Sequence, residues 1–397
     1  MNMLTKERFL DICHFKRQGD LCLLGTHVNA FWRETYGKWR TQGAPEFFAD
    51  PPAKFSMSRI YGFFEFEDTR WLREIDSGLL FGIRYIEIAG KEVLDLSHLL
   101  NPKFEFRQID EDEKTVTFRM SSGQVAKVLK NRPGMPMYID WPVKDRKSWE
   151  EIKRRLNPNT PERYPSDWKA YVEEINKLKV PIVLQVGGFF GFLREWVGTE
   201  KVLYLFYDDP NLVEEIMDTI LFLEMEIVKR VSKDIKFQMA AYWEDMAYNA
   251  GPLISPAMFQ KFMRPRYQKL NELLHSVGVD IIFVDSDGNL DLLIPMWLQC
   301  GVNFVWPLEV AAGNDAVALR KKYGKDLILA GNIDKRALIK GPEAIREEVM
   351  SKVPFLLEKG GYFPSVDHLV PPDVTFENYC YFINLLREIG GLEKLKF

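Results

Sequence analysis

The sequence has 397 residues, 46% of them hydrophobic and 28% charged, with a formal net charge of −4 at pH 7. This composition predicts a globular protein with a large core, and it excludes the basic surface typical of nucleic-acid-binding proteins. No apolar run approaches the ~18 residues of a membrane span, the N-terminus has no secretion signal and the four cysteines have no CxxC spacing, so we expect a reduced cytoplasmic protein without disulfides.

Apolar β-rich runs alternate with helical patterns in the C-terminal half, as in a parallel sheet covered by helices. Two helix starts are marked by a capping side chain before a proline, at Asp209-Pro210 and at Ser255-Pro256. Together these patterns predict an α/β fold, a (β/α)8 TIM-type barrel. We expect its strands at 21–25 (LCLLG), 137–141 (MYIDW), 181–186 (PIVLQV), 237–242 (FQMAAY), 280–284 (DIIFV), 302–306 (VNFVW), 326–330 (DLILA) and 361–365 (GYFPS).

The segment 83–143 follows a different pattern. Strand-like runs at 104–110, 115–120 and 124–129 are separated by the polar turns EDEK and SSG, which predicts an antiparallel meander. We expect this segment to be inserted before the main run of barrel strands and to lie over one end of the barrel as a β-rich cap. The whole chain, 1–397, is therefore predicted to form one barrel domain with this insertion.

The functional groups of a (β/α)8 barrel project from the C-terminal ends of its strands, so the residues after each predicted strand are the candidates. They form an acidic set with one histidine and one lysine. The set comprises Gly187 and Gly188; Trp243, Glu244 and Asp245; Asp285, Asp287 and Asn289; Glu309; Asn332, Asp334 and Lys335; and Asp367 and His368.

The motif VDSDGN, residues 284–289, is the most informative of these strand ends. Asp285 and Asp287 follow an apolar strand, and Gly288 permits a tight turn. Two carboxylates two residues apart can face one cavity, where they would ligate a cation, accept substrate hydrogen bonds or share a proton. The alternative is an Asx turn in which Asp287 caps the following helix.

The other strand ends allow a functional and a structural interpretation each. Either Glu244 or Asp245 is expected to enter the barrel mouth, unless the charge is bound by backbone amides. Lys335 and the amides of 331–335 would bind an anion, unless Asp334 is simply the cap of the following helix. His368 is expected to be functional because it lies at the predicted catalytic end, and the charge of Glu309 in an apolar stretch indicates a nearby partner.

Residues 180–391 resemble the uroporphyrinogen decarboxylase superfamily. The resemblance rests on WEDMAYNAGPLISPAMFQKFMRPRYQKL, VDSDGNLDLLIPMWLQCGVN, LAGNIDK and VPPDVTFENYCYF. It implies a (β/α)8 barrel with one of two chemistries. One is decarboxylation of the acetate arms of uroporphyrinogen without a metal or cofactor. The other is methyl transfer between a corrinoid protein and a thiol or related acceptor, through a zinc-bound thiolate. The looser N-terminal half, with ERFLDICHFKRQGDLCLL and FWRETYGKWRTQGAP, is similar to the corrinoid-associated methyltransferase members.

The sequence departs from both branches of this superfamily at its functional motifs. The decarboxylases grip substrate carboxylates with an RQAGR stretch, where this chain has KRQGD with Arg17, and they have an FSDI-like motif that is missing here. The methyltransferases bind zinc through HxCG and a later GCxxPP-like cysteine. The resemblance places Asp285 on the histidine and Asp287 on the cysteine of the first motif, and His368 on the later cysteine. Two carboxylates and an imidazole thus replace a histidine and two softer thiolates.

The resemblance, taken with these departures, implies methyl transfer between a corrinoid carried by a partner protein and a small acceptor bound at the barrel mouth. Asp285, His368 and Glu244 are the expected catalytic residues, and Asp285, Asp287 and His368 are the candidate ligands of zinc or another divalent metal. Decarboxylation of uroporphyrinogen or a related acid, non-catalytic binding of a corrinoid or tetrapyrrole, and a homodimeric state are left open. The expected substrate-binding residues are Asp287, Asn289, Trp243, Asp245, Glu309, Asn332 and Lys335.

Overall fold

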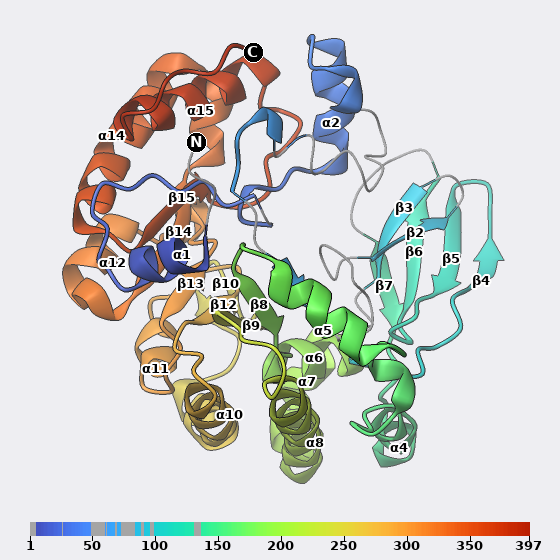
Figure 1. Cartoon of the computed structure of the whole chain (residues 1–397). Helices are drawn as coiled ribbons and strands as arrows, with labels where there is room; N and C mark the ends of the chain where they lie inside the picture. The colour runs from blue at the N-terminus through green and yellow to red at the C-terminus, as the bar shows by residue number, and fades with distance from the viewer. Residues whose placement is uncertain are drawn as a thin grey trace.

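A computed structural model describes residues 5–25, 27–48, 60, 62–67, 70–72, 84–88, 91–95, 99–130 and 136–397. Its centre is a parallel sheet of seven strands in the order β1-β8-β9-β12-β13-β14-β15, which forms the wall of a TIM-type barrel (Figure 1). None of the described helices is long and apolar enough to span a membrane. The strands are β1 (Arg70–Leu72), β8 (Ile182–Gln185), β9 (Met239–Trp243), β12 (Ile282–Asp285), β13 (Phe304–Trp306), β14 (Ile328–Ile333) and β15 (Tyr362–Val366).

The segment 21–25 completes the barrel with a single parallel bridge instead of the extended strand that we expected. Leu24 bridges Glu67, whose backbone NH donates to the carbonyl of Leu23 and whose carbonyl accepts from Gly25. The side chains of Cys22 and Leu24 belong to the apolar cluster inside the barrel. The segment therefore occupies the position of a first strand.

The barrel interior is a packed core of alternating strand residues. Phe283 and Phe304 meet edge to face at 4.9 Å, and Phe304 stacks on Phe363 at 5.5 Å. The N-terminal end of the barrel is closed by α1 (Lys6–Cys13), whose Phe9 stacks on Phe363 at 5.8 Å. Because this end is filled with apolar side chains, polar chemistry is confined to the opposite, C-terminal end.

Helices cover the outside of the sheet because each presents one apolar stripe to it. Both predicted caps are confirmed: the side chain of Asp209 accepts from the NH of Leu212, and that of Ser255 accepts from Met258. A π-helical turn, Phe259–Met263, follows the second cap before α10 continues. The helices are α2 (Arg33–Thr41), α4 (Arg146–Arg154), α5 (Trp168–Lys177), α6 (Phe189–Val197), α7 (Thr199–Asp208), α8 (Pro210–Val231), α9 (Pro256–Met258), α10 (Arg264–Ser276), α11 (Ile294–Leu298), α12 (Ala316–Tyr323), α13 (Lys335–Lys340), α14 (Pro342–Lys359) and α15 (Phe376–Ile389).

Antiparallel strands occupy the described part of the predicted insertion, beside the barrel (Figure 1). A hairpin of β2 (Arg84–Ile88) and β3 (Lys91–Asp95) precedes a four-stranded meander. The meander consists of β4 (Arg107–Glu111), β5 (Thr115–Arg119), β6 (Val125–Leu129) and β7 (Met137–Asp140). Outside the insertion, a separate short hairpin joins β10 (Ala247–Tyr248) to β11 (Gly251–Pro252). Residue 83 lies outside the described residues, and the single-domain organisation with a cap over one end of the barrel stays a prediction.

The prediction that 137–141 is a barrel strand was wrong. The segment forms β7, which pairs antiparallel with β6 through Ala126 and Tyr138. Met137 and Ile139 are exposed on alternate positions, whereas a barrel strand would bury both faces. The barrel position belongs to β1, Arg70–Leu72, which pairs parallel with β8. Three residues within a charged stretch carry too little pattern for a strand to be recognised.

Candidate functional site

Three aspartates meet where β9 and β12 end. Asp285 pairs with Trp243 across the sheet, so the turns that follow the two strands lie side by side. Asp245, Asp285 and Asp287 each bring a carboxylate oxygen within 4.8 Å of the other two. We call these residues the aspartate cluster. All three are partly exposed, as expected for groups at a barrel mouth.

Arg194 of α6 is the cationic partner of this cluster. Its guanidinium lies 3.0 Å from Asp245 and 5.4 Å from the centre of the Trp243 ring. Asp245 has a φ of +43°, which an aspartate adopts more readily than most residues. That backbone conformation turns Asp245 toward the cluster, while Glu244 beside it points into the protein. Arg194 therefore fixes both Asp245 and Trp243.

His368 lies next to the cluster at the end of β15. Its Nε2 is 3.5 Å from Oδ1 of Asp287, and its ring stacks on Trp306 at 6.0 Å and lies 6.4 Å from the ring of Trp32. Burial and the positive charge of Lys335 lower the pKa of the His368 imidazole. Removal from water and the charges of Asp245 and Glu309 raise the pKa of Asp287. At neutral pH these shifts favour an uncharged imidazole beside a protonated carboxyl group.

Lys335 connects the remaining acidic groups of the mouth. Its ammonium nitrogen lies 3.4 Å from Asp367 and 3.6 Å from Glu309. Glu309 also accepts a hydrogen bond of 3.0 Å from the backbone NH of Gly288, in the turn that carries Asp287. Burial raises the pKa of Asp367, and Lys335 opposes that shift. Lys335 is thus placed between two carboxylates of the protein and not in an open anion site.

Glu244, expected to be catalytic, is fully buried and bound on all sides. Its carboxylate accepts from the backbone NH groups of Phe189, Phe190 and Gly191, at 2.8 to 2.9 Å, and from the hydroxyl of Tyr267. Those NH groups begin α6, where a negative charge is favourable. Burial nevertheless raises the pKa of Glu244 to about 7. This is the backbone-bound alternative, in which the residue holds the start of α6 in place.

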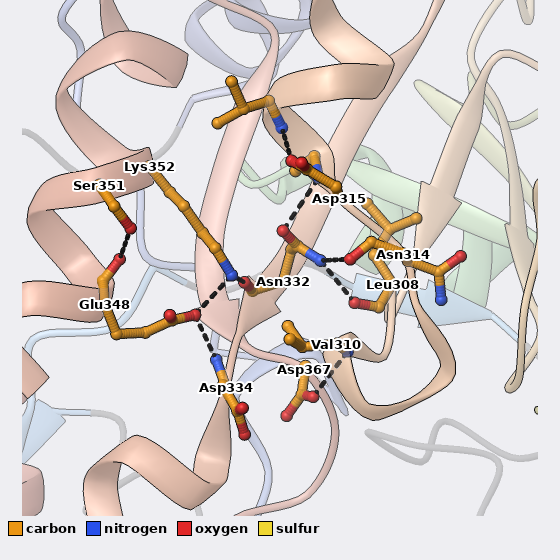
Figure 2. Close-up of polar contacts among 12 residues, drawn as sticks. Leu308, Val310, Asn314, Asp315, Asn332, Asp334, Glu348, Ser351, Lys352 and Asp367 are labelled. Carbon is orange, nitrogen blue, oxygen red and sulfur yellow. Dashed lines mark hydrogen bonds and ion pairs between the residues drawn. The ribbon is translucent and has the colours of Figure 1, made fainter. Parts of the chain in front are cut away.

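The two asparagines that were predicted to bind substrate make hydrogen bonds within the protein. Asn332 is fully buried with a φ of +68°; its amide donates to the carbonyls of Leu308 and Asn314 and its oxygen accepts from Ala316 (Figure 2). Asn289 donates to the carbonyl of Ala312. Both side chains tie the loops behind the mouth together, so neither is directed at a ligand.

The donor set suits a hard cation and not the zinc of a thiolate site. All four cysteines are buried and free, and among the described residues the aspartate cluster is the one group of three or more potential metal ligands. Carboxylate oxygens are preferred by magnesium and manganese, whereas zinc sites that activate thiols rely on softer ligands. The predicted ligands were Asp285, Asp287 and His368. In the structure Asp245 joins the two aspartates, and His368 lies beside Asp287.

Sequence reasoning missed Arg194 and gave Asp367 no role. Arg194 lies within a helix, so nothing in its local pattern marks it as a site residue. Asp367 is adjacent to His368 and only 1% exposed, and an aspartate next to a strand-end histidine was the available signal. Trp243, Asp245, Asp285, Asp287, Glu309, Lys335 and His368 are the predicted residues that the structure brings to the mouth.

A sequence profile described as Uroporphyrinogen decarboxylase (URO-D) matches residues 131–389, well over half of the chain. The chain belongs to the URO-D family. This family member is distant from its curated relatives. It is 22% identical over 268 residues to the uroporphyrinogen decarboxylase of a Nitratiruptor species, covering 61% of this chain and 71% of that one. It is 24% identical over 263 residues to that of Pseudoalteromonas translucida, covering 62% and 70%.

A solved methyltransferase from Methanosarcina mazei has the same fold. It superposes with a TM-score of 0.54 and 15% sequence identity over 97% of this URO-D family member and 99% of that chain. The likeness confirms the barrel architecture inferred from the sequence. At this identity it does not extend to the activity.

Proposed function

We propose that this URO-D family member catalyses methyl transfer between a corrinoid held by a partner protein and a small acceptor bound at the barrel mouth. The observation that carries the proposal is the charge of that mouth. Asp245, Asp285, Glu309 and Asp367 face two described cations, Arg194 and Lys335, and both cations are paired with carboxylates of this set. A site of this charge favours a neutral or cationic ligand.

The alternative substrate, uroporphyrinogen, carries many carboxylates that need positive partners. Arg194 is held 3.0 Å from Asp245 and Lys335 lies between Glu309 and Asp367, so a polyanion would meet carboxylates first. The curated relatives nevertheless bear the name uroporphyrinogen decarboxylase, which keeps decarboxylation as the second candidate. Release of carbon dioxide from uroporphyrinogen by the purified protein would establish it, at the expense of the proposed function.

We assign the handling of the acceptor's proton to His368. The corrinoid would supply an electrophilic methyl group, released by breaking its cobalt–carbon bond with the electron pair left on the metal. The uncharged imidazole of His368 accepts the proton that the acceptor loses as its new bond to carbon forms. Asp285 and Asp287 orient the acceptor, and stacking on Trp306 fixes the plane of the imidazole. Asp245, held by Arg194, completes the acidic wall of the site.

The activity test uses free methylcobalamin as the methyl donor and a panel of thiols, amines and phenols as acceptors, with the cobalt absorption spectrum as readout. We expect acceptor-dependent demethylation, slowed about a hundredfold by His368→Asn, the range for loss of a general base. His14→Asn is the matched control, because His14 follows α1 at the opposite end of the barrel. Absence of demethylation with every acceptor contradicts the proposal.

A bound divalent metal is a separate prediction for the same site. If one is present, the aspartate cluster would hold it, and the metal would polarise the acceptor and favour its deprotonation. Elemental analysis of untagged protein should then give stoichiometric manganese or magnesium that is lost in Asp285→Ala. Equal, sub-stoichiometric metal in both proteins would remove the metal from the proposal and leave the acid–base roles intact.

A further inference from the structure

Asp367 is the most deeply buried charge among the carboxylates of the mouth. Only 1% of its surface is exposed, and it lies where β15 ends, directly before His368. Oδ2 accepts a hydrogen bond of 2.9 Å from the NH of Val310, and Oδ1 accepts one of 3.1 Å from the NH of Lys335 (Figure 2 shows the contact with Val310). One carboxylate thus joins the loops that follow β13, β14 and β15.

The ammonium group of Lys335 adds a contact that backbone capping does not require. It lies 3.4 Å from Oδ1 of Asp367 and reaches 3.6 Å toward Glu309, whose other oxygen accepts from Gly288. The connection therefore runs from the end of β15 to the turn that carries Asp287. An asparagine at 367 could accept only one of these two backbone hydrogen bonds, because its amide nitrogen is a donor, and it could not hold the lysine by charge.

We propose that Asp367 is a positioning residue that fixes the Lys335 ammonium beside the Asp287–His368 pair. Lys335 is then the positive charge that holds Glu309 and the Gly288 turn in register with His368. The catalytic use of Lys335 in this assignment rests on the proposed function. The placement of Lys335 itself is a separate claim, so the two can fail separately.

Acetylation of lysines by an N-hydroxysuccinimide ester, followed by mass spectrometry, tests the placement without any assay of activity. In the wild-type protein Lys335 should react several-fold more slowly than the exposed Lys340 of the same helix, because its ammonium is held between two carboxylates. Asp367→Asn should raise the Lys335 rate several-fold. The matched control is Asp334→Asn, which removes a charge from the cap of α13 and should leave the rate unchanged.

Equal rates for Lys335 and Lys340 in the wild-type protein would overturn the assignment, even if Asp367→Asn did not fold. So would an unchanged Lys335 rate in a folded Asp367→Asn variant. A slow Lys335 in the wild type that is released in Asp367→Asn supports it, whether or not methyl transfer is observed. That last combination, release of Lys335 without methyl transfer by any protein, would retain the positioning role and reject the proposed function.

The methylcobalamin assay then shows whether the placement matters to turnover. Asp367→Asn should lower kcat about tenfold with little change in KM, because misplaced groups cost rate more than binding. In the background of Lys335→Met the same substitution should have almost no further effect, since Asp367 acts through Lys335. Fully additive losses would show that Asp367 has a structural role alone.

Discussion

At the scale of single residues, the mouth depends on close backbone contacts as much as on charges. Gly188 begins the turn between β8 and α6 with a φ of −137°, which any residue can adopt. Its requirement for glycine is a matter of space: an added Cβ would lie 1.8 Å from the carbonyl oxygen of Trp243. The glycine pair identified in the sequence therefore brings the start of α6 against the strand end that carries Glu244.

Gly188→Ala should destabilise the protein by about 3 kcal/mol, the upper range for overpacking, because the clash is with backbone that cannot rotate away. The free energy of unfolding in urea measures the loss. Gly62→Ala is the control: its Cβ would meet nothing within 4 Å, so stability should stay the same or rise. Equal stability of Gly188→Ala and the wild type would show that the strand end adjusts freely.

At the scale of elements, buried carboxylates fasten helices to the barrel. Glu224 of α8 is 2% exposed and accepts a hydrogen bond of 3.1 Å from the NH of Gly187, at the end of β8. Burial raises its pKa from 4.5 to about 7. Glu244 likewise fastens α6, through the NH groups at the start of that helix. Both are charged residues that the sequence alone would place on a surface or in the site.

The sign of the pH effect follows from the raised pKa. The folded state binds the Glu224 proton more tightly than the unfolded state, so its contribution to stability is present below pH 4.5 and lost as pH rises to about 7. Glu224→Gln should remove this loss, so that its stability relative to wild type improves by about 3 kcal/mol between pH 4.5 and 8. Urea denaturation across that range measures it, with the exposed Glu226→Gln as control. A difference independent of pH contradicts the prediction.

At the scale of the whole molecule, a largely buried ion cluster fastens α1 to the segment that begins the barrel and to Glu67. Arg8 of α1 contacts Asp20 at 2.6 Å and Glu67 at 2.5 Å, and it donates to the carbonyl of Leu21. Glu67 is itself one partner of the bridge to Leu24, and Asp20 and Leu21 lie a few residues before Leu24. The short first strand is thus held by side chains where the backbone ladder is nearly absent.

Arg8→Met should cost about 3–5 kcal/mol, because it leaves Glu67 buried without its cationic partner. Calorimetric unfolding of the variant provides the measurement. Arg336→Met, which removes an exposed ion pair with Asp334, should cost less than about 1 kcal/mol. Similar small losses in both variants would mean that the cluster does not hold the barrel closed.

The sequence by itself determined the barrel class, six of its strands and the acidic end where they terminate, because alternating apolar runs and capped helices are local patterns. It also indicated the meander, whose strands are separated by polar turns. Residues 21–25 and 137–141 show the limit, because both are short β-rich runs. Pairing with Glu67 decided that the first completes the barrel, and pairing with β6 decided that the second joins the meander.

Only the tertiary structure decided which polar strand-end residues face the mouth. Glu244 and Asp245 are adjacent, yet a φ of +43° and the NH groups of α6 send one inward and the other to the aspartate cluster. Arg194 and Asp367 acquire their roles from contacts with other elements. A side chain's direction and partners depend on the packing of distant segments, and that information is absent from any local pattern.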